Sequence, residues 1–180
     1  AYMIWLPAGG AKSPPSAETI ARGEHYIRME GKETYRFATR TLATTALAAI
    51  RHAGLEPADI DLFIPHQANI RIIDAVAKGL DLSMDKMFVN LDKYGNTSAA
   101  SVPIALAEAA NSGRIKVGDT VVIVAFGAGF TSGAVAIRWT QDPARGIAGD
   151  AAVRPEEVTV RLPVDWDSVD PIPPALAALM

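Results

Sequence analysis

Two apolar runs separated by a glycine-rich turn constrain the fold of this chain most. The segment "GDTVVIVAFGAGFTSGAVAIRW" spans residues 118–139, with the turn at 127–129. β-Branched residues favour strands, and a short glycine-containing turn between two such runs predicts a β-hairpin. Because both runs are apolar along most of their length, we expect this hairpin to lie deep in a core.

Helix and strand patterns alternate along the residues before the hairpin. Apolar residues recur at 3.6-residue spacing in the helical stretches, and Gly54 and Gly113 are placed to end two of them. We expect helices over residues 33–53, 70–80 and 98–113, a strand at 59–66, and a short strand and turn within 87–101. This alternation through residues 33–140 predicts an α/β fold.

The two ends of the chain differ from this body. Residues 1–32 are predicted to be irregular, because the Gly and Pro residues of "PAGGAKSPPS" are typical of a loop. Residues 141–180 hold six of the twelve prolines and an excess of acids. We expect this extension to pack on the body or to be partly mobile, with one edge strand at "EEVTVRL" (residues 156–162).

Composition excludes several classes of function. The net charge of −3 gives no sign of a nucleic-acid partner. The absence of cysteine excludes disulfides, thiolate metal sites and a cysteine nucleophile within this chain. No apolar run approaches the roughly 20 residues that cross a bilayer, and the start is unlike a signal peptide. We therefore expect a cytoplasmic protein without a membrane partner and, because it opens at Ala1 within an apolar run, a piece of a longer one.

His66, at the end of a predicted strand, is the first candidate for chemistry. Polar groups that follow a strand and lead into a helix are a common place for catalytic residues, although a lone histidine there is more often structural. His25 and His52 do not give metal-ligand spacing with it, so no metal site is expected.

Further candidates have both structural and functional interpretations. Asn69 precedes the helix at 70–80 and can serve as its N-cap. Asn96 lies in the turn "YGNTSAAS", where Thr97 or Ser98 can cap the next helix. The turn at 127–129 lacks the lysine and the helix of a phosphate-binding loop.

Two basic residues lie seven positions apart on the helix after His66. Arg71 and Lys78 share a face opposite to Ile72 and Ile73. This face is either simply solvated or a docking patch for an acidic partner.

Three ordered motifs resemble the C-terminal half of 3-oxoacyl-acyl-carrier-protein synthase III, the condensing enzyme that starts bacterial fatty-acid synthesis. They are "PHQANIRII", "YGNTSAASVPIALAEA" and "GRIKVGDTVVIVAFGAGFTSGAVAIRW", in the family's order and at its separations. The resemblance implies half of a thiolase-like fold, with a mixed five-stranded sheet and helices on its faces, in a homodimer. It also implies three parts: residues 1–32 from the end of the N-terminal half and the tunnel region, a C-terminal domain over 33–140, and an extension over 141–180.

The resemblance further implies roles for individual residues. His66 and Asn96 match the catalytic pair that donates hydrogen bonds to the thioester carbonyl of malonyl-acyl-carrier protein, which stabilises the enolate formed when carbon dioxide leaves. A neutral imidazole and an amide can do this without transferring a proton. The backbone N–H of Ala128 serves a second oxyanion hole. Asn69 and Gly31 contact the pantetheine arm, and the residues that dock the acidic carrier protein are Arg36, Arg71 and Lys78.

The family's nucleophile is a cysteine of the N-terminal half, which this chain lacks. We therefore expect the chain to be inactive alone and to act with that half on acyl-CoA and acyl-carrier-protein substrates, without a cofactor. The expected reaction is a decarboxylative Claisen condensation that initiates fatty-acid synthesis. The alternatives are a related secondary-metabolite acyltransferase, and a non-catalytic half that binds pantetheine or pairs with a catalytic chain.

Overall fold

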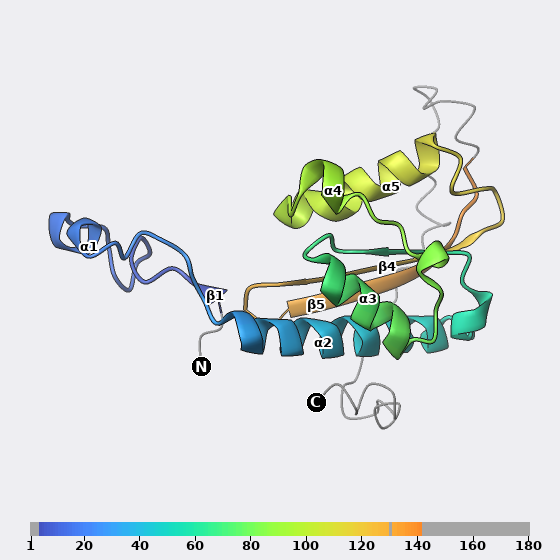
Figure 1. The fold of residues 1–180 in the computed structure, drawn as a ribbon, viewed down its shortest axis with the longest axis horizontal. Helices are drawn as coiled ribbons and strands as arrows, with labels where there is room; N and C mark the ends of the chain where they lie inside the picture. Colours follow the sequence, from blue (N-terminus) through green and yellow to red (C-terminus); the bar gives the residue numbers. More distant parts are fainter. Residues whose placement is uncertain (1–3, 130, 142–180) are drawn as a thin grey trace.

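The body of the molecule is a mixed sheet of three strands with helices on both faces (Figure 1). The computed structural model describes residues 4–129 and 131–141. Strand β3 (Leu62–Pro65) runs parallel to β4 (Thr120–Gly127), which runs antiparallel to β5 (Thr131–Arg138). The predicted α/β class is confirmed.

The predicted hairpin is β4 and β5. The two strands pair without a break from Thr120 opposite Arg138 to Gly127 opposite Thr131. Gly129 has φ +85°, a left-handed conformation that glycine adopts without steric cost. Four of the eight residues of β4 are buried and the other four are half-buried, whereas residues of β5 mostly alternate between exposed and half-buried. The expectation that the hairpin lies deep in a core is wrong for β5: Ala134 and Ala136 pack on the larger core, but Val135 on the opposite face is 43% exposed.

Helices α2 (Gly31–His52) and α3 (Ile70–Gly79) cover one face of the sheet and enclose the larger core (Figure 1). Their apolar faces follow the helical spacing of the sequence, so both predicted helices are confirmed within two residues at each end. Every second residue of a strand points to this face, as the pleat requires. The core members include Leu42, Ile50, Phe63, Ile73, Val76, Val122 and Val124.

Helix α5 (Ser101–Asn111) packs on the opposite face of the sheet. Its contact residues Ala105 and Ala109 are fully buried, and their small side chains let the helix lie close to the strands. The strand residues that meet them are Leu62, Ile64 and Val121, with Ile115 closing the end of this second core.

The five strands implied by the resemblance are not all present in the described residues. Beside β3 the chain forms only one parallel bridge, between Phe63 and Met87, so the strand predicted within 87–101 is wrong. The side chain of Gln67 explains why: its amide takes the hydrogen bonds of the Phe88 carbonyl and the Asn90 N–H. A side chain, and not a neighbouring strand, thereby takes the hydrogen bonds of these two backbone groups. The chain then continues into the short helix α4 (Leu91–Tyr94).

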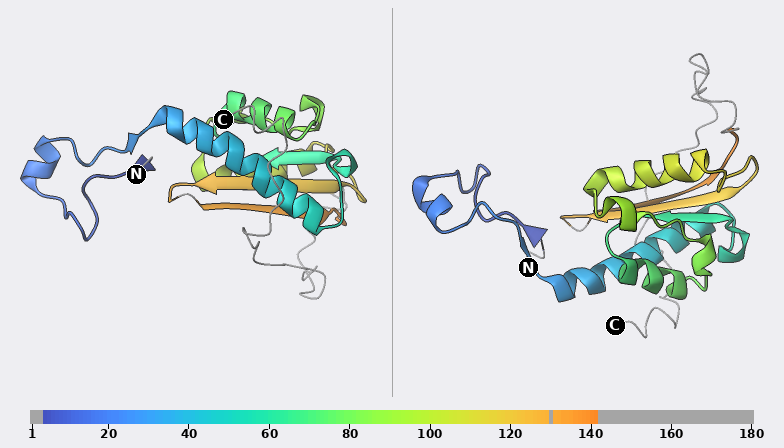
Figure 2. Two further views of the ribbon diagram at one scale, coloured as in Figure 1. Left: turned by 90° about the horizontal axis from the view of Figure 1, so that it is seen from below. Right: turned by 45° about the horizontal axis from the view of Figure 1, so that its top comes forward.

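Residues 4–30 form a projecting arm that is mostly irregular, and the loop predicted at residues 7–16 is confirmed. The antiparallel pair β1 (Ile4–Trp5) and β2 (Arg28–Met29) forms its base, and α1 (Ala17–Ala21) lies toward its tip. Figure 2 shows the arm extending away from the body beyond the first residue of α2. A capping box at Ser16 and Thr19 starts α1.

The extension predicted over 141–180, including the strand at 156–162, lies outside the described residues apart from Gln141. Among the helices of residues 4–129 and 131–141, none has the length and hydropathy needed to cross a bilayer.

The larger core should dominate stability. Leu42 is fully buried in that core, whereas Arg40 on the same helix is exposed. We predict that Leu42→Ala lowers the free energy of unfolding by about 2–5 kcal/mol through lost burial and a residual cavity. The matched variant Arg40→Ala should change it by less than about 0.5 kcal/mol. Urea unfolding of the three proteins tests this, and equal midpoints would contradict the packing described.

Candidate active site

The candidate site lies where two parallel strands end at the same edge of the sheet. Pro65 pairs with Val124, and the His66 N–H then donates to the Val124 carbonyl at 2.8 Å. This pairing sets His66 beside the turn at 127–129 that follows β4. Ligands of α/β proteins commonly bind beyond the carboxyl ends of parallel strands.

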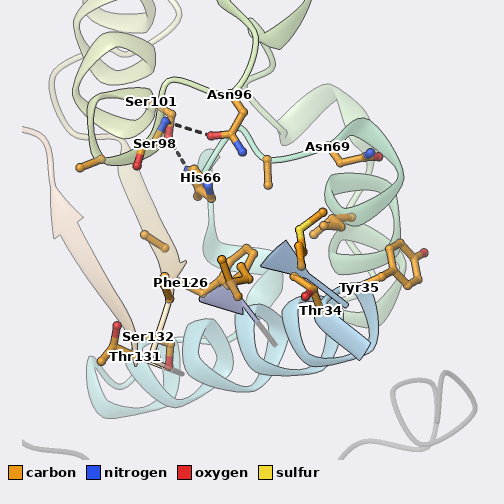
Figure 3. A pocket seen from close by; sticks show the side chains of 18 of the residues that line it. Thr34, Tyr35, His66, Asn69, Asn96, Ser98, Ser101, Phe126, Thr131 and Ser132 are labelled. Atoms are coloured by element: carbon orange, nitrogen blue, oxygen red, sulfur yellow. Dashed lines mark hydrogen bonds between the residues drawn. The ribbon is translucent and has the colours of Figure 1, made fainter. Parts of the chain in front are cut away.

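A pocket of about 1160 Å³ opens at this edge (Figure 3). It is bordered by α2, the turn after β4, the start of α5 and the arm. Among its described lining residues there is no Asp, Glu, Lys or Arg. Within the described part of the chain, no group of three metal-ligating side chains is placed to hold an ion. The pocket brings together five of the predicted site residues: Gly31, His66, Asn69, Asn96 and Ala128.

The His66 side chain is held between a hydroxyl and an aromatic ring. It is 9% exposed, and its Nδ1 lies 2.5 Å from the Oγ of Ser101. The ring of Phe126 meets it edge-on, with centroids 5.6 Å apart. Burial lowers the pKa of His66 from its ordinary value. The imidazole is therefore neutral at pH 7 and can present one N–H donor and one acceptor.

Asn96 is exposed at the pocket, and its amide is oriented by the backbone. Its Oδ1 accepts a hydrogen bond from the Ser98 N–H at 2.9 Å (Figure 3). The described residues give its Nδ2 no partner, so that group is free to donate to a ligand. Ser98 has φ +54°, a strained conformation for serine and one that clusters at functional sites.

The predicted capping of the following helix by Thr97 or Ser98 is wrong. Neither side chain makes a cap hydrogen bond, and a 3₁₀ turn over Ser98–Ala100 comes before α5. The side chain of Asn96 takes the Ser98 N–H instead, which delays the start of the helix to Ser101.

Gln67 ties the strand that carries His66 to the segment that leads to Asn96. It is 1% exposed, and its Nε2 donates to the carbonyls of Pro65 (2.8 Å) and Phe88 (3.1 Å). Its Oε1 accepts from the Asn90 N–H at 3.0 Å. Sequence reasoning assigned no role to this residue, although its place directly after His66 was a signal.

A further brace runs from Asn90 to α5. The Nδ2 of Asn90 donates to Glu108 at 2.8 Å, and Glu108 also forms an ion pair with Lys93. The start of the loop that carries Asn96 is therefore held to both Gln67 and α5.

Asn69 and Gly31 lie at the pocket wall. The Oδ1 of Asn69 accepts from the Arg71 N–H at 2.8 Å, so the predicted N-cap of α3 is confirmed. Figure 3 shows its side chain pointing away from His66. Gly31 is the first residue of α2. Binding of a pantetheine arm by these two residues stays a prediction.

The three basic residues predicted to dock a carrier protein do not line the pocket. Arg36 is exposed on α2, and Arg71 and Lys78 are exposed on α3, where Ile72 and Ile73 are buried as expected. Arg36 forms an ion pair with Glu33 at 3.1 Å, and Lys78 forms one with Asp74 at 2.7 Å. Their docking role stays a prediction.

Comparison with solved structures defines the class of fold. The chain superposes on β-ketoacyl-[acyl carrier protein] synthase III from Thermus thermophilus with a TM-score of 0.62 and 51% identity, covering 64% of this chain and 36% of that one. A priming β-ketosynthase from a polyketide biosynthetic pathway gives a TM-score of 0.62 at 32% identity, covering 72% and 40%. The molecule is thus a thiolase-like α/β unit.

Sequence comparison gives the family. The model of the "3-Oxoacyl-[acyl-carrier-protein (ACP)] synthase III C terminal" family matches residues 50–139. The β-ketoacyl-[acyl-carrier-protein] synthase III of Symbiobacterium thermophilum is 52% identical over 136 residues, which are 76% of this chain and 41% of that protein. The chain belongs to the 3-oxoacyl-[acyl-carrier-protein] synthase III family, as the motifs indicated. It spans about four tenths of the length of the curated relatives it matches.

The hydrogen bonds of Gln67 should contribute to stability. Gln67→Met keeps the length of the side chain but leaves the Phe88 carbonyl and the Asn90 N–H without their partner. We predict that it lowers the free energy of unfolding by about 1–3 kcal/mol, the usual cost of buried unpaired groups. Exposed Asn111→Leu, a polar-to-apolar change on α5, is the control. Chemical unfolding measures the free energy of unfolding of both variants. If Gln67→Met left this free energy unchanged, the stabilising role of the Gln67 hydrogen bonds would be wrong.

The lowered pKa of His66 should appear in the pH dependence of stability. Because burial lowers its folded-state pKa from the ordinary 6.5, the unfolded chain binds more protons below that pH. The free energy of unfolding should therefore fall as the pH drops from 7 through 6. His66→Gln should weaken this dependence. Exposed His52→Gln controls for loss of a histidine, and identical pH profiles for native and His66→Gln proteins would contradict the prediction.

Proposed function

We propose that this chain supplies the C-terminal part of the active site of an acyltransferase, a ketosynthase that condenses an acyl-CoA primer with malonyl-acyl-carrier protein to initiate fatty-acid synthesis. The observation that carries the proposal is the uncharged pocket in which His66 and Asn96 both present neutral polar groups. In the whole protein, a cysteine of the N-terminal half completes the site, and this chain without that half is inactive.

The reaction has two steps. First, the cysteine thiolate attacks the carbonyl carbon of the acyl-CoA, and CoA leaves as a thiolate, so the acyl group is carried as a thioester. Second, the carbon–carbon bond to the malonyl carboxylate breaks and carbon dioxide leaves. The electron pair of the broken bond stays on the carrier-bound thioester and forms its enolate. The enolate carbon attacks the acyl-cysteine carbonyl, which forms the new carbon–carbon bond and expels the cysteine thiolate.

His66 and Asn96 act in the second step. Negative charge develops on the thioester oxygen as carbon dioxide leaves, and two fixed donors stabilise it best when no water competes. The neutral state of His66 suits this role, because a neutral imidazole donates a hydrogen bond without being consumed as an acid. The backbone N–H of Ala128 serves the acyl carbonyl at the other oxyanion hole, at a turn with little side-chain bulk.

The substrates enter through the uncharged pocket. A pantetheine arm carries amides and methyl groups but no charge, which matches a lining without charged side chains. Asn69 and Gly31 contact this arm, and Arg36, Arg71 and Lys78 on α2 and α3 dock the acidic carrier protein. CoA and phosphopantetheine thioesters are substrates, and no cofactor takes part. The assembled protein works as a homodimer in the cytoplasm.

A second candidate is a priming ketosynthase of secondary metabolism. The 32% identity to a polyketide priming β-ketosynthase favours it. Both functions use the same pocket chemistry and differ in the acyl primer and in the protein that receives the product. Turnover of a panel of acyl-CoA primers by the whole protein distinguishes them, whereas pantetheine binding without any turnover would indicate a non-catalytic half.

Removal of either donor should stop decarboxylation selectively. We predict that His66→Ala and Asn96→Ala in the whole protein each lower malonyl decarboxylation by roughly 10²–10³-fold, the usual effect of losing one oxyanion donor. Primer acylation of the cysteine should persist, measured by intact-mass spectrometry after incubation with acetyl-CoA.

The matched control is His52→Ala, which removes an exposed histidine at the end of α2. Its decarboxylation rate should equal that of the native protein. Undiminished decarboxylation by His66→Ala would show that the role proposed for His66 is wrong.

A further inference from the structure

Ser101 lies against the catalytic histidine at the back of the pocket. It is the first residue of α5, it is 2% exposed, and its Oγ is 2.5 Å from the Nδ1 of His66. The same oxygen accepts a hydrogen bond from the Gln67 N–H at 3.3 Å. Ser101 therefore meets both the ring and the backbone of the segment that carries the site.

Counting donors and acceptors assigns the direction of the hydrogen bond between Ser101 and His66. A serine hydroxyl has one hydrogen to donate and two lone pairs to accept with. The Gln67 N–H occupies one lone pair, and among the described residues Nδ1 is the only acceptor for the hydroxyl hydrogen. If Nδ1 carried the proton and donated instead, the hydroxyl hydrogen would be buried without a partner, which costs free energy.

We propose that Ser101 is a positioning residue that donates its hydroxyl hydrogen to Nδ1 of His66 and thereby fixes the tautomer with the proton on Nε2. The Nε2 of His66, on the side of the ring away from Ser101, is then a hydrogen-bond donor and not an acceptor. This inference deepens the proposed function, on which its catalytic consequence rests, because oxyanion stabilisation by His66 needs that donor.

The surroundings of the ring support the same state. Ser101 is the first residue of α5, so the positive end of the helix dipole lies near Nδ1 and disfavours a proton there. The other close neighbour is the apolar ring of Phe126, and no charged side chain lines the pocket in the described residues. Nothing in these surroundings offers an anion that would draw a proton to Nδ1.

The tautomer can be measured without any assay of activity. In the whole protein labelled with ¹⁵N-histidine, two-bond ¹H–¹⁵N correlation spectra at pH 7.5 show which ring nitrogen of each histidine carries the proton. His66→Gln assigns the signals. We expect a protonated Nε2 and an unprotonated, hydrogen-bonded Nδ1. A protonated Nδ1 in the native protein would overturn the inference.

Variants of Ser101 test its part in this preference. Ser101→Ala should shift the Nδ1 signal toward that of a nitrogen without a hydrogen bond, and Ser101→Thr, which keeps the hydroxyl, should restore it. Ser112→Ala at the other end of α5 is the matched control and should leave the His66 signals unchanged. An unmoved Nδ1 signal in Ser101→Ala would also overturn the inference, and the spectrum of the native protein decides its direction even where this variant fails to fold.

Kinetics separate this inference from the proposed function. Ser101→Ala should lower kcat for malonyl decarboxylation roughly 10- to 100-fold, by analogy with the loss of partners that orient metal-binding histidines, with KM unchanged and with rescue in Ser101→Thr. If the spectra behave as expected but the native protein decarboxylates no malonyl thioester, the proposed function is wrong and the assignment of the tautomer stands.

Discussion

The parallel pairing of β3 with β4 decides where every part of the site lies. It brings the ends of two strands to one edge, so that His66 emerges beside the turn at 127–129. The register matters as much as the pairing, because a slip of one residue would turn every side chain to the other face. Phe126 would then lose its edge-on contact with the His66 ring, and Val122 and Val124 would no longer point into the larger core. Core packing and site geometry are thus specified by the same register.

The chemistry proposed for this arrangement uses neutral groups. Hydrogen bonds behind the pocket position these groups: Gln67 bonds to the backbone of Phe88 and Asn90, and Ser101 bonds to the ring of His66. The Ser98 N–H, on a strained backbone, donates a hydrogen bond to the side-chain amide of Asn96, which faces the pocket. Strain of this kind persists only where the surroundings determine the conformation, and here the packed sheet and α5 supply those surroundings.

The sequence was sufficient for the parts of the fold with regular periodicity. Regular spacing of apolar residues along the sequence predicts the helices α2, α3 and α5, the strand at 62–65 and the hairpin. The motifs identified five residues that meet in the pocket. The path from Met87 to Ser101 was predicted wrongly, because the amide of Gln67 replaces a neighbouring strand and no local pattern encodes that exchange. Ser101 was missed for a similar reason, since its partner His66 is 35 positions away in the sequence. The short strands of the arm escaped prediction because each is only two residues long.

The proposed function requires His66 and Asn96 to bind one oxygen atom together. A crystal structure of the whole protein with a malonyl thioester analogue that cannot lose carbon dioxide tests it most directly. We expect the thioester oxygen to lie about 3 Å from both the Nε2 of His66 and the Nδ2 of Asn96, with the pantetheine arm along Asn69 and Gly31. An analogue bound with its thioester oxygen beyond hydrogen-bond reach of either donor, or with its arm outside this pocket, would show that the roles proposed for His66 and Asn96 are wrong.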